Sequence, residues 1–299
     1  ADWQTALRSV TFSSSSEDPT ATQTVADRIV TFVISDGDVD STAVDRIVTV
    51  SPVNDAPVLS DVEPTSLAYT ENDAAATVSL SIAVSDLDTL TDPALDSATV
   101  AISAGMQSGD LLAYPDTSSG INSTYDVTSG VLTMIGAGSV SDWQTALRAV
   151  TYSSSSEDPT GSQSAANRTV TFVISDGDAS SNAVSRTVIV TPVNDVPVLL
   201  ADMEGSSLMY TENNPATAVS PSITVSDLDT LTDPVLDSAT VTISDGMQSG
   251  DVLGYSVMGS LISASFDSGS GALTMIGAVS VPDWQTALRA VTYSSSSED

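Results

Sequence analysis

The chain has 299 residues, and its charged groups are almost all acidic: 39 aspartates and glutamates stand against 7 arginines, without any lysine, histidine or cysteine. The net charge of -32 excludes nucleic acid and anionic membrane surfaces as partners, and no apolar run is long enough for this region to insert into a membrane. The missing residues exclude disulfides, thiolate nucleophiles and Cys-ligated zinc and remove the commonest general base, whereas a hydrophobic content of 41% predicts a folded chain whose acidity needs counterions.

The sequence is an internal repeat. The segment Asp-Trp-Gln-Thr-Ala-Leu-Arg begins three times, at Asp2, Asp142 and Asp283. Because insertions are best tolerated between domains, we place module boundaries at the Asn-Asp-X-Pro-Val-Leu linkers, after Ala56 and Val196. The predicted parts are the C-terminal part of one module (1–56), a complete module (57–196) and the N-terminal part of the next (197–299).

The complete module shows the two-residue alternation that is typical of β-strands. In chain order, the predicted strands are 78–84, 98–102, the two halves of a hairpin over 123–135, 170–174 and 184–190. Serine and threonine occupy the alternate positions and suit a solvated sheet face. Seven or so short strands in about 140 residues indicate an all-β fold, a tandem Greek-key β-sandwich of the cadherin or immunoglobulin type.

One short helix interrupts this pattern in each module. Asp142 is the expected N-cap, and helical spacing places Trp143, Ala146 and Leu147 on one face. A lone Trp on an apolar face is more often core than a carbohydrate platform, so we expect Trp143 to be buried. The arginines also recur with the repeat, which favours internal ion pairs, or stems packed along the sheet, over a binding role.

Oxygen-bearing side chains gather at predicted strand ends and turns. The candidate metal ligands are Glu71, Asp86, Asp88, Asp92, Asp176, Asp178, Asn194, Asp195, Glu212, Asp227, Asp229 and Asp233. Ca²⁺ takes six to eight hard oxygen ligands in flexible geometry, so this pattern predicts calcium. The alternatives are solubilising turn residues, or the paired carboxylates of a glycosidase. The second is disfavoured because a whole active site would have to be duplicated in tandem, so no enzymatic activity is expected.

Several segments of the complete module resemble a known group of repeats. They are Arg168 to Gly177 with Val193 to Leu199, Ala146 to Tyr152, and Gly130 to Thr133. They look like the tandem cadherin-like, immunoglobulin-like repeats of giant bacterial surface adhesins of the repeat-in-toxin type, and they are similar to repeats of the chondroitin sulfate proteoglycan family. The resemblance covers essentially the whole chain.

This resemblance implies calcium between modules. A glutamate (Glu71 or Glu212), an Asp-X-Asp motif (Asp86 with Asp88) and the linker pair (Asn194 with Asp195) would be its ligands. Pro192 and Val193 stand where cadherins have further carboxylates, which leaves open the alternative of sites within modules.

Two functions remain open at this stage. The first is a non-catalytic, calcium-rigidified extender of an extracellular, cell-surface adhesin, acting in cell adhesion or biofilm, whose partners are neighbouring modules. The second is a filament or matrix subunit whose partial modules are completed by other copies of the chain. The partial modules are also consistent with a window cut from a longer repeated chain. Binding of glycans or ice is disfavoured because aromatic residues make up only 5% of the chain.

Overall fold

A computed structural model describes residues 2–20, 24–88, 94–115, 120–161, 166–200, 206–229 and 233–296. Internal contacts divide the chain into two units: the first comprises 1–156 with 166–190, and the second comprises 157–165 with 191–299. The module boundaries after Ala56 and Val196 stay a prediction. Among the described residues, no helix is both long and apolar enough to cross a membrane.

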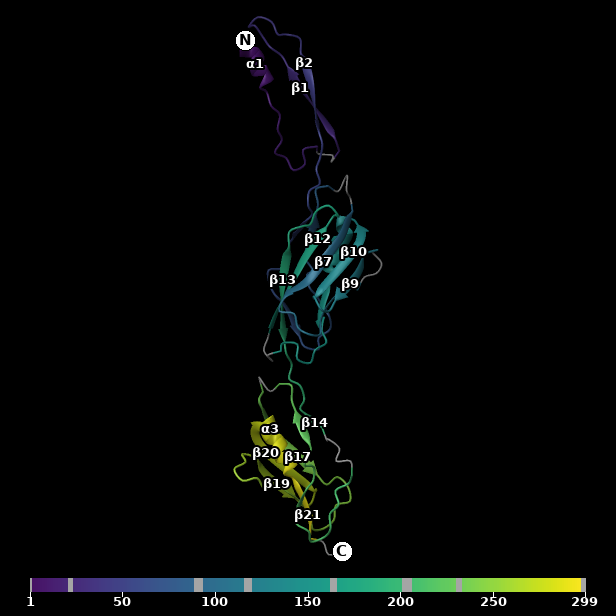
Figure 1. The fold of residues 1–299 in the computed structure, drawn as a ribbon, viewed down its shortest axis with the longest axis vertical. Coiled ribbons are helices and arrows are strands. Elements are labelled where there is room, and N and C mark those ends of the chain that lie inside the picture. The colour runs from purple at the N-terminus through teal and green to yellow at the C-terminus, as the bar shows by residue number, and fades with distance from the viewer. Residues whose placement is uncertain are drawn as a thin grey trace. The chain divides into compact units, whose positions relative to one another are not determined.

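The complete module is built from three antiparallel sheets and one helix (Figure 1). Its elements are β3 (Val58–Ser60), β4 (Leu67–Thr70), β5 (Ala76–Thr77), β6 (Ala83–Ser85), β7 (Leu95–Ala104), β8 (Asp110–Ala113), β9 (Asn122–Asp126), β10 (Val131–Gly138), α2 (Val140–Arg148), β11 (Thr151–Ser154), β12 (Ala166–Ser175) and β13 (Val184–Thr191). The largest sheet has the order β4-β13-β12-β7-β10-β9, and the smaller sheets are β5-β11-β8 and β3-β6.

A single buried core holds these sheets together. Val100 and Phe172 enter it from the large sheet, Val84 and Tyr152 from the two smaller sheets, and Trp143 from the helix. Each of these sheets therefore buries one face against the others, as in a β-sandwich. The predicted all-β fold is confirmed, and so are the strands over 98–102, 170–174 and 184–190, the hairpin over 123–135 and the burial of Trp143.

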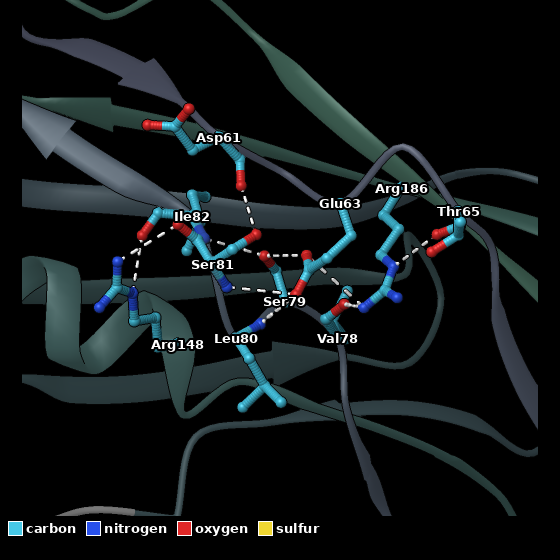
Figure 2. Close-up of polar contacts among 10 residues, drawn as sticks. All are labelled: Asp61, Glu63, Thr65, Val78, Ser79, Leu80, Ser81, Ile82, Arg148 and Arg186. Atoms are coloured by element: carbon cyan, nitrogen blue, oxygen red, sulfur yellow. Dashed lines mark hydrogen bonds and ion pairs between the residues drawn. The ribbon is translucent and has the colours of Figure 1, made fainter.

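The predicted strand over 78–84 is wrong as a continuous element. Only two short strands form near its ends: β5, which pairs with β11, and β6, which pairs with β3. Leu80 lies between them and is 70% exposed. The carboxylate of Glu63 takes the place of a neighbouring strand, because it accepts hydrogen bonds from Ser79 Oγ (2.6 Å), Leu80 N (2.7 Å) and Ser81 N (3.2 Å) (Figure 2). A side chain thus satisfies backbone groups that the alternation assigned to a sheet.

Two arginines satisfy the carbonyl groups of the same segment. Arg186 donates from Nη1 to the carbonyl oxygen of Val78 (2.6 Å) and lies 3.6 Å from the Glu63 carboxylate. Arg148 donates from Nε to the carbonyl oxygen of Ile82 (2.8 Å). The predicted internal role of the arginines is confirmed at these two positions, and Figure 2 shows how both side chains reach the interrupted strand.

The helix begins three residues earlier than its sequence suggests. The N-cap is Ser139, and Asp142 is the third helical residue, whose carboxylate accepts from the Ser139 backbone N–H (3.0 Å). Ser139 Oγ in turn accepts from the Asp142 N–H (3.2 Å), so the two residues form a capping box. The prediction of Asp142 as N-cap is therefore wrong, because the acidic residue acts from inside the first turn.

The N-terminal part contains helix α1 (Asp2–Arg8) and the antiparallel hairpin of β1 (Ala26–Phe32) with β2 (Val44–Val50). The hairpin corresponds to β12 and β13 of the complete module. Its apolar residues Ile29 and Ile47 are 67% and 58% exposed. Its sheet contains only these two strands among the residues the structure describes.

The C-terminal part repeats the first strands of the complete module. Its elements are β14 (Val198–Leu200), β15 (Thr217–Ala218), β16 (Thr224–Ser226), β17 (Val235–Thr242), β18 (Asp251–Gly254), β19 (Ser263–Asp267), β20 (Ala272–Ser280), α3 (Val281–Arg289) and β21 (Thr292–Ser295). The sheets are β14-β16, β15-β21-β18 and β17-β20-β19. Within the described residues β17 is an edge strand, whereas its counterpart β7 lies between two neighbours.

Candidate metal centre

The second unit holds an acidic cluster around the linker residue Asp195. Directly after β16, Asp227 and Asp229 form a tight turn in which Asp227 Oδ1 accepts from the Asp229 N–H (3.0 Å). Asp229 is 6% exposed, and its Oδ2 accepts a hydrogen bond from the backbone N–H of Asp195. One carboxylate oxygen of Glu157 lies within 4.8 Å of one of Asp195. Residues far apart in the sequence thus bring their carboxylates to one place.

The carboxylate of Asp195 lies among other negative charges. Its Oδ2 is buried and has no hydrogen-bond partner among the described residues. Burial raises the pKa of Asp195, and the charges of Asp229, Glu157, Asp227 and Asp158 raise it further. Among the described residues, no arginine forms an ion pair with Asp195. The negative charges around Asp195 therefore repel one another.

This donor set fits Ca²⁺. All the donors are oxygens, and Ca²⁺ is coordinated by six to eight oxygen ligands. The buried Oδ2 atom of Asp195 accepts no hydrogen bond among the described residues, so it is free to coordinate a metal ion. Asp195, Asp229, Glu157 and Asp227 would hold the ion. When bound, the ion would supply positive charge and cross-link the linker, the Asp-X-Asp turn and the Glu157 segment.

The first unit repeats the same arrangement at the preceding linker. The N–H of Asp88 donates to Asp86 Oδ1 (2.9 Å), and Oδ2 of Asp88 accepts from the backbone N–H of Asp55. Asp88 is 6% exposed, like its counterpart Asp229. A contact between an Asp-X-Asp turn and an Asn-Asp linker thus occurs twice, each time within one unit. The residues differ from the set that the resemblance implied, because Asp88 meets Asp55 and Asp195 meets Asp229.

Other predicted ligands have structural partners of their own. Asp176 Oδ1 accepts from the N–H groups of Asp178 (2.9 Å) and Ala179 (2.7 Å), and its Oδ2 accepts from the Asn54 side chain (3.0 Å). Burial alone would raise the pKa of Asp176, but these hydrogen bonds hold it below its usual value. Asn194 donates from Nδ2 to the carbonyl oxygen of Asp195 (2.8 Å). Asp176 and Asn194 therefore also stabilise a turn and the linker.

Four of the predicted ligands remain. Glu71 is buried at the end of β4 (4% exposed), whereas Glu212 and Asp233 are exposed. Asp92 lies outside the described residues. Glu157 was missed by the sequence analysis. The signal that could have identified it is the Glu-Asp pair at 157–158, which repeats Glu17-Asp18 in step with the other acidic motifs.

The sequence matches no protein-family model and no curated protein. Among solved structures, the chain is similar to protocadherin gamma C5 EC1-3, with 14% identity, a TM-score of 0.27, and coverage of 88% of this chain and 70% of that one. It is also similar to human CDH23 EC21-23 (15% identity, TM-score 0.26, coverage 85% and 65%) and to domains 4-9 of the surface layer protein SbsC (10% identity, TM-score 0.23, coverage 79% and 29%). At these identities the similarity concerns the fold alone, so the function has to be argued from the site.

Proposed function

We propose that this chain is a non-catalytic, calcium-binding spacer from an extracellular bacterial surface protein, and that its modules hold an adhesive part away from the cell in cell adhesion or biofilm. The observation that carries this proposal is the buried Oδ2 atom of Asp195. It has no hydrogen-bond partner among the described residues, and Asp229 and Glu157 lie beside Asp195. The equivalent Asp55–Asp88 contact at the preceding linker supports a repeated site.

Charge repulsion makes the site sensitive to calcium. Two unit charges 4 Å apart interact by about 4 kcal/mol at an effective dielectric constant near 20, and the charges of four neighbouring carboxylates act on Asp195. A divalent cation converts this repulsion into attraction. Extracellular modules bind calcium with dissociation constants on the order of 10⁻⁴ to 10⁻³ M, so the sites would fill outside the cell and stay empty at cytosolic calcium levels.

A spacer is the role that fits a repeated module with one such site at each linker. In tandem arrays each repeat mainly contacts its neighbours, so the reach of the chain grows with the number of copies. Calcium that bridges the linker and the adjacent turn would limit bending at that point. Catalysis is not part of the proposal, because the candidate carboxylates recur from copy to copy and the chain has no histidine to serve as a general base.

Titration calorimetry of the whole chain, freed of metal with a chelator, tests the proposal. We expect Ca²⁺ to bind, Mg²⁺ to bind more weakly because it demands a stricter octahedral geometry, and both Asp195→Asn and Asp229→Asn to lower the number of calcium ions bound. Asp245→Asn is the matched control, because this aspartate is exposed in the loop after β17. The absence of calcium binding, or equal loss in the control, would contradict the proposal.

The spacer role needs a separate measurement. Small-angle scattering of the whole chain should give a larger and better-defined maximum dimension with calcium than with chelator. An unchanged scattering profile, together with confirmed calcium binding, would retain the metal site and reject its mechanical role.

A further inference from the structure

The loop between β18 and β19 has diverged from its counterpart in the complete module. Residues 256–266 differ from the equivalent residues 115–125 at every position but two, whereas 283–299 are identical to 142–158. The two copies share one fold here, so the divergence is confined to this loop and the edge strand that follows it. Loops on a common scaffold are where related domains differ in what they bind.

The divergence turns a polar loop into an apolar one. Pro-Asp-Thr-Ser-Ser-Gly at 115–120 is replaced by Ser-Val-Met-Gly-Ser-Leu at 256–261. Met258 is 99% exposed and Leu261 is 83% exposed, and Val257 in the same loop is also exposed. Apolar side chains that gather on one exposed loop are typical of a binding surface, whereas single scattered ones are ordinary.

A cavity of about 310 Å³ lies between this loop and helix α3. Tyr255, Val257 and Leu261 line it on the side of the loop. Asp283 and Thr286 line it on the side of the helix. Its volume is at the lower end of the range for small-molecule sites, which is about 300–1,000 Å³.

Hydrogen bonds fix the course of the loop. Ser260 Oγ accepts from Tyr255 Oη (2.6 Å) and from the Ile262 N–H (3.0 Å). The Ser260 N–H donates to the carbonyl oxygen of Val257 (3.2 Å). The wall of the cavity is therefore preformed, which reduces the entropy lost when a ligand binds.

The surroundings of this cavity are those of a complete module. The equivalent of β19 is β9, which is the edge strand of the large sheet and is separated from β12 by β10 and β7. The equivalent of α3 is α2, which contacts β6 and β10. The counterparts of β12 and β13 thus belong to another side of the module and do not form the walls of the cavity.

The polar side chains on the helix offer hydrogen-bond acceptors. The carboxylate of Asp283 accepts from the Ser280 hydroxyl (2.6 Å) and carries further lone pairs. Thr286 Oγ1 donates its proton to the carbonyl oxygen of Pro282 (2.9 Å), so its lone pairs can accept from a ligand. The net charge of -32 disfavours anions. These groups select a ligand that donates hydrogen bonds and carries positive charge.

We propose that this cavity binds a small organic cation with an apolar body, of which an alkylammonium ion is the simplest example. The ammonium group donates to Asp283 and Thr286, and the hydrocarbon part packs against Val257 and Leu261. A bare metal ion would gain nothing from these apolar side chains. None of the described residues that line the cavity belongs to the proposed calcium site, so the two proposals stand or fall separately.

Saturation-transfer nuclear magnetic resonance of the whole chain at physiological ionic strength is the first test, with hexylammonium, methylammonium, hexanoate and hexanol as probes. We expect hexylammonium to bind with a dissociation constant on the order of 1 mM. Each other probe lacks either the positive charge or the apolar body, and should bind at least about 10-fold more weakly. Equal binding of methylammonium would identify an adventitious ion only. That result, equal binding of hexanol or hexanoate, or no binding of hexylammonium would overturn the proposal.

Two changes test the two walls of the cavity. Asp283→Asn removes the negative charge, and exchange of 256–261 for the sequence of 115–120 removes the apolar side chains. Each should weaken hexylammonium binding at least about 10-fold. The exchanged loop should fold, because the complete module carries the same sequence at the equivalent place.

Asp142→Asn is the matched control. Asp142 has the same place in α2 that Asp283 has in α3, but it follows the polar loop. We expect this variant to bind hexylammonium like the unmodified chain. An equal loss in this control, or unchanged binding in both variants of the cavity, would reject the site.

Methionine methyl resonances report where the ligand lies. Met258 lines the cavity, whereas Met134 is fully buried in the core of the complete module. Titration with hexylammonium should shift the methyl resonance of Met258 and leave that of Met134 unchanged. Shifts of both resonances, or of neither, would contradict binding in this cavity.

Discussion

The backbone N–H of Asp195 donates a hydrogen bond to the carboxylate of Asp229, 34 residues further along the chain, and the same bond joins Asp55 to Asp88. This hydrogen bond holds a linker residue and an Asp-X-Asp turn together without a cation. The linker carboxylate then lies among other carboxylates. This relationship underlies the first prediction.

Metal-free protein should respond to pH through Asp195. Its pKa is raised above 3.8 in the folded state by burial and by neighbouring carboxylates. A raised folded-state pKa means that stability is present below the ordinary pKa and is lost as the pH rises through the raised value. Relative to Asp195→Asn, the metal-free chain should therefore lose thermal stability as the pH rises above 3.8, and calcium should reverse the loss. Melting curves against pH test this; a difference between the two chains that does not vary with pH would contradict it.

Arg168 and Asp110 form a fully buried ion pair (Nε to Oδ2, 2.6 Å), and breaking it should destabilise the first unit. Arg168→Met leaves Asp110 buried without its cation, and we expect a loss of about 3–5 kcal/mol in the free energy of unfolding. Arg28→Met is the matched control, because Arg28 lies outside any such pair among the described residues and should change stability by less than about 0.5 kcal/mol. Denaturant unfolding of dilute chain measures both. Similar effects of the two substitutions would contradict the importance of the pair.

Glu63 should make the stability of the first unit decrease at acidic pH. Burial alone would raise its pKa, but hydrogen bonds from Ser79 and Leu80 and the charge of Arg186 lower it from 4.5 to about 2. A lowered folded-state pKa contributes stability above 4.5 that is lost as the pH falls towards 2. Glu63→Gln should cost about 1–3 kcal/mol at neutral pH and flatten the acid limb of the unfolding curve.

The control for Glu63 is Asp61→Asn. Asp61 is exposed, and its carboxylate accepts a hydrogen bond from the adjacent Ser60 hydroxyl (2.9 Å). We expect the unfolding free energy of this variant to follow that of the unmodified chain at each pH. An acid limb that Glu63→Gln leaves unchanged would show that the carboxylate does not organise the interrupted strand.

Substitutions at two glycines should distinguish the cost of backbone strain from the cost of a steric clash. Gly105 and Gly120 both have positive φ values, +75° and +79°. A Cβ at position 105 would lie 2.0 Å from the carbonyl oxygen of Asn167, whereas a Cβ at 120 would meet nothing within 4 Å. Gly120→Ala should therefore cost only the backbone strain of about 1–2 kcal/mol, and Gly105→Ala should cost clearly more. Thermal unfolding distinguishes them; equal effects would contradict the close approach of strands β7 and β12.

Much of the fold follows from sequence alone. Alternation predicts the strands over 98–102 and 170–174, because side chains on a strand point to opposite faces and a half-buried sheet needs one apolar face. Helical spacing predicts the burial of Trp143, and the repeat predicts that every motif recurs. The same pattern fails over 78–84, because it reports which side chains are buried and not which groups satisfy the backbone. There, Glu63 takes the place of a neighbouring strand.

For the acidic site, the sequence by itself determined the class of chemistry, since a chain with many carboxylates and neither histidine nor cysteine offers hard oxygen ligands. Only the tertiary structure decided which of these oxygens meet. It places the carboxylate of Glu157 near that of Asp195, whereas the carboxylate of Asp176 accepts a hydrogen bond within a turn. The physical reason is that coordination depends on distance in space, and the folding of distant segments against one another sets that distance.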